Sequence, residues 1–117
     1  MLSEVLDITA QFKADTLYTL DLSNWDNAVI QLVGLSAGTI TFNATNDGGG
    51  VTGVTDGDSR SVGNLIAVQV TNLNTGTAVT SATGAGLYRA GVVGRYLQLT
   101  GSGVTITKIL VYLSKIS

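Results

Sequence analysis

The residues with the most obvious chemical potential form one short stretch, Asn46-Asp47-Gly48-Gly49-Gly50, directly after an alternating segment. A glycine-rich loop holds phosphate when a helix N-terminus and a Lys-Ser/Thr pair complete it, and neither follows here. Asparagine, aspartate and glycine are also the residues that tolerate positive φ in tight turns. We therefore interpret Asn46, Asp47, Gly48 and Gly49 as a structural turn and predict no cofactor.

Oxygen ligands for a metal ion are the second candidate. Asp47, Asp56 and Asp58 fall in one loop region, with Asn43 and Asn46 nearby. Calcium takes such oxygens, but the D-x-D-x-D-G spacing of an EF-hand is missing. We predict solvated turn carboxylates and no metal site.

Catalytic chemistry has few residues to draw on. The chain has neither histidine nor cysteine, so a serine or threonine nucleophile would lack its usual base. Most of the eight acidic residues fall in expected turns or near the N-terminus, not in a pair across a cleft. We predict that the protein is not an enzyme and has no catalytic residues.

The charge distribution indicates which kinds of partner the protein can bind. Charged residues make up 12% of the chain and the net charge is −2. The six basic residues are scattered and form no stripe, which argues against nucleic acid as a partner. Mean hydropathy is +0.36, and an isolated soluble domain usually has a more charged surface. We therefore expect other subunits to cover much of this surface.

The first seventeen residues, MLSEVLDITAQFKADTL, include Glu4 and Asp7 and no long apolar run. This pattern predicts neither a signal peptide nor a membrane span, so we expect no membrane partner and assembly in the cytoplasm. Residues 3–12 fit a short helix and a strand about equally well, and their β-branched residues lead us to expect a strand.

Short alternating segments dominate the rest of the chain. Ile40, Phe42 and Ala44 alternate with polar residues in 38–45, and residues 28–35 are apolar on both faces, as in a central strand. Residues 65–73 are predicted to point Ile66, Val68 and Val70 inward. Residues 94–101 are predicted to point Leu97 and Leu99 inward, with Tyr96 and Gln98 outward.

The final segment, residues 103–116, changes phase between Ile106 and Ile109. Either a bulge near Thr107-Lys108 or burial on both faces would account for this change. Turn residues recur every eight to twelve positions throughout. The sequence therefore predicts an all-β fold, an antiparallel β-sandwich or jelly-roll-like barrel of seven to nine short strands, in a single domain.

Two stretches carry a resemblance to a known group. VGLSAGTITFNATNDGG, followed later by Gly94, Tyr96, Leu97 and Leu99, resembles small β-sandwich virion proteins of tailed bacteriophages. ITKILVYLS looks like the closing strand of such modules, and the resemblance covers roughly residues 28 to 113. It implies a structural component of a bacteriophage virion, either a capsid decoration (cement) protein or a tail or head-fibre module, with no catalytic residues.

Three expectations about partners follow. We expect self-association as a trimer or dimer, and binding to major capsid protein or to other virion proteins. Residues 1–15 are either a docking arm or an ordinary first strand, with 16–117 as the sandwich domain. The apolar residues of that arm are Leu2, Val5, Leu6, Ile8 and Phe12.

A carbohydrate-binding sandwich is the alternative, if Trp25, Tyr88 and Tyr96 form an exposed stacking platform. A lone tryptophan between strands is otherwise a lid on the core.

Overall fold

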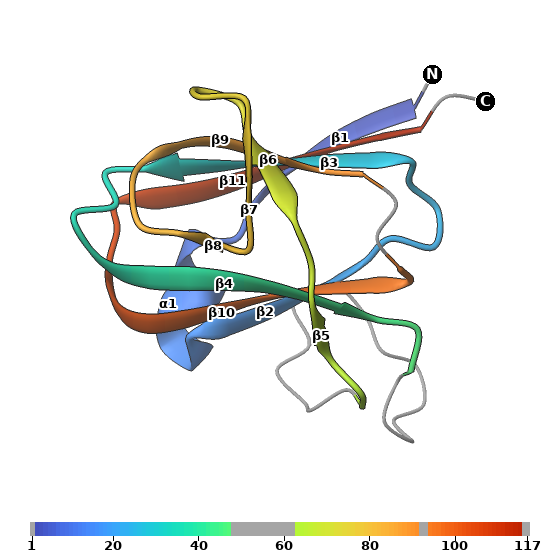
Figure 1. The fold of residues 1–117 in the computed structure, drawn as a ribbon, viewed down its shortest axis with the longest axis horizontal. Helices are drawn as coiled ribbons and strands as arrows, with labels where there is room; N and C mark the ends of the chain where they lie inside the picture. Colours follow the sequence, from blue (N-terminus) through green and yellow to red (C-terminus); the bar gives the residue numbers. More distant parts are fainter. Residues whose placement is uncertain (1, 48–62, 92–93, 116–117) are drawn as a thin grey trace.

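The structure, a computed structural model, describes residues 2–47, 63–91 and 94–115. These residues form eleven strands and one helix, and the strands build two antiparallel sheets that lie face to face (Figure 1). The predicted fold class, an all-β antiparallel sandwich, is confirmed. The expected strand number was too low, because strands of two or three residues are too short to show a period in the sequence.

The first sheet has six strands, in the spatial order β1 (Leu2–Asp7), β11 (Lys108–Lys115), β3 (Asn27–Val33), β9 (Gly86–Ala90), β6 (Val70–Asn72) and β7 (Thr77–Val79). The second sheet runs β2 (Leu17–Asp21), β10 (Tyr96–Thr105), β4 (Ala37–Thr45) and β5 (Ile66–Ala67), with β8 (Ser81–Ala82) also paired to β4. Leu2 is opposite Lys115, so the two ends of the described chain lie side by side (Figure 1).

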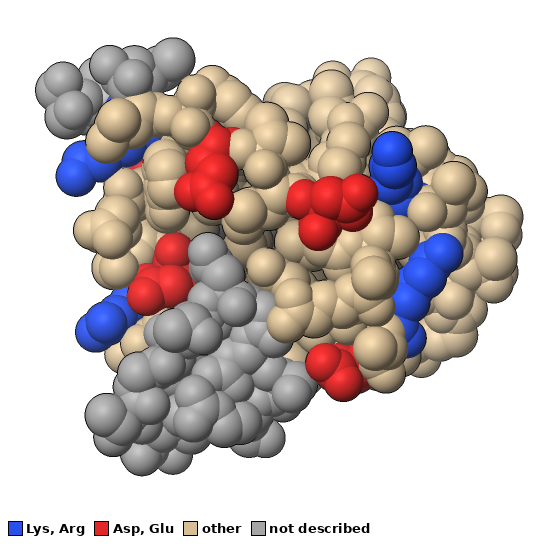
Figure 2. Space-filling view, turned by 180° about the vertical axis from the view of Figure 1, so that it is seen from behind, with Lys and Arg blue, Asp and Glu red and all other residues tan. Residues whose placement is uncertain are grey.

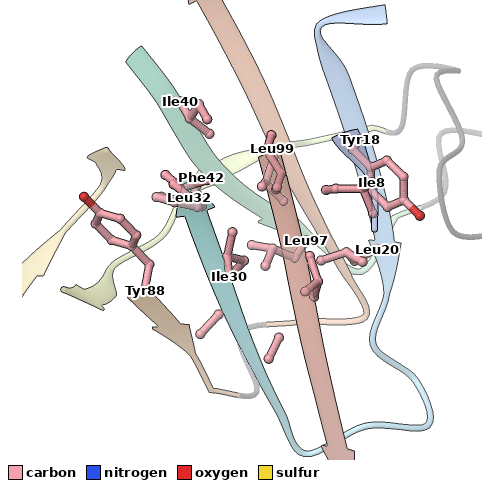
Figure 3. Close-up of a cluster of buried hydrophobic side chains, with 14 of the residues drawn as sticks. Ile8, Tyr18, Leu20, Ile30, Leu32, Ile40, Phe42, Tyr88, Leu97 and Leu99 are labelled. Carbon is pink, nitrogen blue, oxygen red and sulfur yellow. The ribbon is translucent and has the colours of Figure 1, made fainter. Parts of the chain in front are cut away.

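The core fills the space between the sheets. Ile30 and Leu32 of β3 face Phe42 of β4 across this space, and Leu97 and Leu99 of β10 complete the layer (Figure 3). All five side chains are at most 1% exposed. The alternation predicted for 38–45 is confirmed, since Ile40, Phe42 and Ala44 are buried. β3 lies between β11 and β9, as expected for a central strand.

The prediction of one strand for residues 3–12 is wrong beyond Asp7. Helix α1 spans Thr9–Asp15, and its single buried residue, Phe12, lies four positions after buried Ile8. This is the spacing that places two side chains on one helical face. The Asp7 carboxylate accepts hydrogen bonds from Thr9 N (3.0 Å) and Thr9 Oγ1 (2.6 Å), which turns the chain out of the strand.

Side chain and backbone also join this turn to β11. Ile8 N donates to Ile109 O at 3.1 Å, and Ile109 N donates to Thr9 Oγ1 at 2.9 Å. The threonine hydroxyl thus takes the place of the backbone carbonyl that would continue the ladder. α1 contacts β2 and β11, and lies beside the two layers in Figure 1.

The phase change in residues 103–116 has a different cause from either predicted one. β10 continues to Thr105 in one sheet, and β11 begins at Lys108 in the other. Ile106 and Thr107 form the connection between them. The register does shift within β10, between Ser102 and Thr105, which lies earlier than the predicted bulge. Because β10 and β11 belong to different sheets, the positions that point into the core change between them without any bulge at the junction.

Residues 65–73 were also predicted too simply. β5 and β6 belong to different sheets, so no single alternating strand exists. Val70 is 2% exposed, whereas Ile66, predicted inward, is 68% exposed. In β10 the predicted outward residues Tyr96 and Gln98 are buried, and Gln98 Nε2 donates to Thr19 Oγ1 at 3.3 Å.

Candidate interaction surface

The described residues at the end of β4 make hydrogen bonds to neighbouring segments of the chain. Asn46 Oδ1 accepts a hydrogen bond from Arg95 N at 2.9 Å, and Asp47 Oδ2 accepts one from Asn64 Nδ2 at 2.7 Å. Thr45 Oγ1 donates to Gly63 O at 2.7 Å. These contacts connect the end of β4 to the start of β10 and to residues 63–64, as a structural turn requires.

Part of the predicted turn and of the predicted metal-ligand region lies outside the described residues, namely Gly48, Gly49, Asp56 and Asp58. Within the described ranges, no group of three or more acidic side chains is close enough to hold a metal ion.

The aromatic platform expected for a carbohydrate site does not form. Tyr88 and Tyr96 are only 3% and 5% exposed, and Trp25 packs against the core as a lid. The Tyr88 hydroxyl donates to Gly84 O at 2.8 Å, and its ring centroid lies 5.9 Å from that of Phe42. Burial raises the pKa of Tyr88. These rings stabilise the fold, and the buried Tyr88 and Tyr96 do not form a stacking platform with Trp25.

A hollow of about 220 Å³ lies at the β4–β5 end of the second sheet. It is smaller than typical small-molecule sites, which begin near 300 Å³. The described residues that line it are uncharged: Ala44, Thr45, Asn46, Asn64, Ile66 and Val68.

The five predicted docking residues divide into two groups. Leu2 and Val5 are 62% and 63% exposed on β1. Leu6 is half-buried and packs against the core, and Ile8 and Phe12 are buried within it. Ile8 and Phe12 are therefore not accessible to a partner in this fold, because the turn at Asp7 and the helix direct them inward.

The outward side of the six-stranded sheet also carries exposed apolar residues, and we call it the open face. Its central row follows the strand register through Val5, Tyr112, Val29, Arg89 and Thr71. Val5 is 63% exposed and Tyr112 is 38% exposed.

A second row on the open face runs through Asp7, Leu110, Gln31 and Leu87. Leu87 is 39% exposed. The exposure of Val5, Tyr112 and Leu87 shows that the described elements leave much of this face uncovered. An apolar, half-exposed sheet face of this kind is suited to contact with another protein.

The free edge of β1, the β1 edge, borders the open face. Because Ile8 N donates to Ile109 O, and because bonding direction alternates along an antiparallel strand, Leu6 and Glu4 direct their backbone groups to β11. Ser3, Val5 and Asp7 then direct theirs away from the sheet. The β1 edge therefore offers unpaired backbone donors and acceptors beside the apolar row.

Charge does not define a binding site on the side of the molecule in Figure 2. Acidic side chains lie at separate points across it, basic side chains lie near its borders, and most of the surface is uncharged (Figure 2). Helix α1 has seven residues, and the described part of the chain holds no helix long and apolar enough to cross a bilayer.

Comparison with known proteins identifies a shared fold. No known family description matches the sequence, and no curated protein matches it either. Among solved structures, the chain is similar to the crystal structure of SPBc2 prophage-derived protein YomS, with a TM-score of 0.67 and 10% sequence identity. The alignment covers 96% of this chain and 92% of that one, so the whole sandwich is shared. At this identity the likeness shows the fold alone.

Proposed function

We propose that this protein is a structural component of a bacteriophage virion, a capsid decoration (cement) subunit that self-associates and binds major capsid protein. Three observations support the proposal. The fold is shared with a prophage-derived protein, the chain has few charges, and much of one sheet face is uncovered. On this proposal the protein acts by binding, without catalysis, cofactor or nucleic acid.

The single observation that carries the proposal is the open face. Val5, Tyr112, Val29 and Leu110 form a contiguous apolar area across three neighbouring strands. Asp7, Lys108 and Arg89 supply its charges, and the first two lie near the end of β1–β11 that is next to α1. An apolar centre with polar surroundings is the usual arrangement of a protein–protein interface.

Burial of this face supplies the binding energy. Each 100 Å² of apolar area removed from water contributes about 2.5 kcal/mol before the costs of association are subtracted. A capsid repeats the same contact many times, and a self-associated subunit engages several copies at once. Multivalent attachment therefore makes a weak single contact strong.

The test has two steps. Virions produced by the genome that encodes the chain are purified, and mass spectrometry determines whether the chain is a stoichiometric component. Immunogold electron microscopy then locates it. Labelling over the head supports the capsid role, labelling over the tail or head fibres transfers the proposal to that module, and absence from particles overturns the virion role.

Variants then test the open face itself. Tyr112→Arg places a charge at the centre of the apolar row and is expected to abolish co-sedimentation of the purified protein with capsids. Ala14→Arg, at an exposed position on α1, is the matched control and should bind as the unmodified protein does. Equal binding by both variants would show that the open face is not the contact surface.

A further inference from the structure

The structure points to a specific way for two copies to associate. We propose that two copies pair antiparallel through their β1 edges about a two-fold axis perpendicular to the sheet, with Val5 opposite Val5 of the second copy. This inference rests on the self-association included in the proposed function. It adds the surface, the symmetry and the register.

The β1 edge is the most available of the four sheet edges. β1 has six residues, and five of them are exposed. β2, the comparable edge of the other sheet, has a buried centre at Tyr18, Thr19 and Leu20 and contacts α1. The remaining edge strands, β5 and β7, have two and three residues. Among the described edge strands, β1 alone is both long and open.

β1 lacks most of the usual protection of an exposed edge. Natural edges are blocked by charged side chains, above all lysine, by proline, by a bulge or by a covering segment. The chain has no proline, β1 has no lysine, and its register with β11 is continuous from Leu2 to Asp7. The charges on β1 are Glu4 and Asp7, so a pairing register must keep like charges from facing one another. The edge is therefore ready to accept another strand.

The backbone direction limits the choice of register. Ser3, Val5 and Asp7 direct their backbone groups outward, so hydrogen-bonded pairs across the two-fold axis must join these residues. A two-fold axis at Val5 gives three such pairs: Val5 with Val5, and Ser3 with Asp7 twice. An axis at Glu4 or at Leu6 gives only two pairs each.

Charge favours the same register. An axis at Glu4 would place the two Glu4 carboxylates directly opposite one another, and like charges in that position destabilise a sheet. The Val5 register instead places Glu4 opposite Leu6, and it places Asp7 opposite the uncharged Ser3. This register combines the most backbone bonds with no directly opposed like charges.

The paired arrangement also joins the two open faces. Val5 lies beside Tyr112 in each copy, so the pairing produces an unbroken row of Tyr112, Val5, Val5 and Tyr112. The apolar area available to the proposed capsid contact then extends across the two-fold axis. A β-branched residue at the centre of such a row packs well against its counterpart.

Sedimentation equilibrium tests the pairing. The unmodified protein is expected to form a dimer, and Val5→Pro is expected to weaken it by about 10- to 100-fold, because each copy loses the central outward donor. Val5→Thr keeps the backbone donor and the β-branched shape, and should change the dissociation constant by less than about fivefold. Trp25 fluorescence and the thermal midpoint verify that both variants are folded.

Cysteine cross-linking tests the register, since the chain has no cysteine of its own. Hydrogen-bonded residues face each other with Cα atoms about 5.5 Å apart, which a disulfide spans. Val5→Cys should give a covalent dimer on mild oxidation, whereas Glu4→Cys should not. A linked Glu4→Cys dimer would overturn the register.

Three results would overturn the pairing: a monomer or trimer for the unmodified protein, a Val5→Pro dimer of unchanged affinity, or no cross-link from Val5→Cys. Their meaning is separate from that of the virion test. A monomer that is nevertheless present in purified particles rejects β1 pairing and leaves the virion role intact. A β1-paired dimer that is absent from particles supports the pairing and rejects the virion role.

Discussion

Phe12 provides the most decisive test of how the N-terminal segment works, because the sequence suggested docking and the structure shows packing. Its ring is 1% exposed and rests on Gly101 of β10. A Cβ atom built on Gly101 would lie 2.9 Å from Phe12 Cζ and 3.1 Å from Phe12 Cε1. The glycine therefore provides the space that the ring occupies.

Phe12→Ala removes this ring and leaves a cavity that Gly101, without a side chain, cannot fill. Buried Phe→Ala changes cost about 3–5 kcal/mol, and limited collapse places this one near 4 kcal/mol. A domain of this size has a total free energy of unfolding of about 5–15 kcal/mol. With a urea m-value of about 1.5 kcal/mol/M, the midpoint should fall by about 2.7 M.

Equilibrium urea unfolding followed by the fluorescence of Trp25, the chain's single tryptophan, measures this shift. Gly101→Ala alone should cost about 1–3 kcal/mol through overpacking. Gly101→Ala combined with Phe12→Leu should cost less than the sum of the two single changes, because the smaller side chain relieves the contact. An unchanged midpoint in Phe12→Ala, together with lost capsid binding, would refute the packing role and restore the docking interpretation.

Three further predictions concern the turns and the strand–helix connection. Gly38 has φ +84°, and an added Cβ would meet backbone atoms at 2.5 Å. Gly38→Ala should therefore lower the free energy of unfolding, measured by thermal denaturation, by at least about 3 kcal/mol. Gly76→Ala, at φ +74° with open space around it, should lower it by only about 1 kcal/mol. Thr9→Val removes the acceptor of Ile109 N, and denaturant titration should show a loss of about 1–3 kcal/mol. The hydrogen bonds from the Thr9 side chain and backbone hold the pKa of Asp7 below its ordinary value. Their contribution to the free energy of unfolding is therefore complete above about pH 4 and is lost as the pH falls through the lowered pKa. Asp7→Asn should make the free energy of unfolding less dependent on pH in this acid range.

Alternation in the sequence was sufficient to predict the fold class. Ile40, Phe42 and Ala44 face the core as their period of two indicates, and Leu97 and Leu99 do the same. The physical reason is that each of these strands stays in one sheet, with one side on the core.

The errors occur where the chain changes sheet or direction. Val104 lies in β10 of one sheet and Ile109 in β11 of the other, so the phase shift that resembled a bulge marks a crossing between sheets at Ile106 and Thr107. Ile66 was assigned inward because a single period was extended through residues that connect β5 to β6. Periodicity describes one element at a time and does not show where an element ends.

The interaction surface was predicted only in part. Leu2 and Val5 were identified as accessible apolar residues, but Tyr112 and Leu87 were not, since their exposure depends on which side of the sheet lacks a covering layer. The pairing of the first strand with the last brings Val5 beside Tyr112, and no local pattern in the sequence contains that information.

The pairing of β1 with β11 has a consequence for biosynthesis. β11 lies between β1 and β3, so the six-stranded sheet cannot be completed until residue 115 has left the ribosome exit tunnel. Until then, β1 and the edge of β3 that pairs with β11 have unpaired backbone groups, and contacts of such large sequence separation make folding slow. A nascent chain of this protein is thus the species most exposed to aggregation, and we expect its yield to depend on chaperones that act during translation.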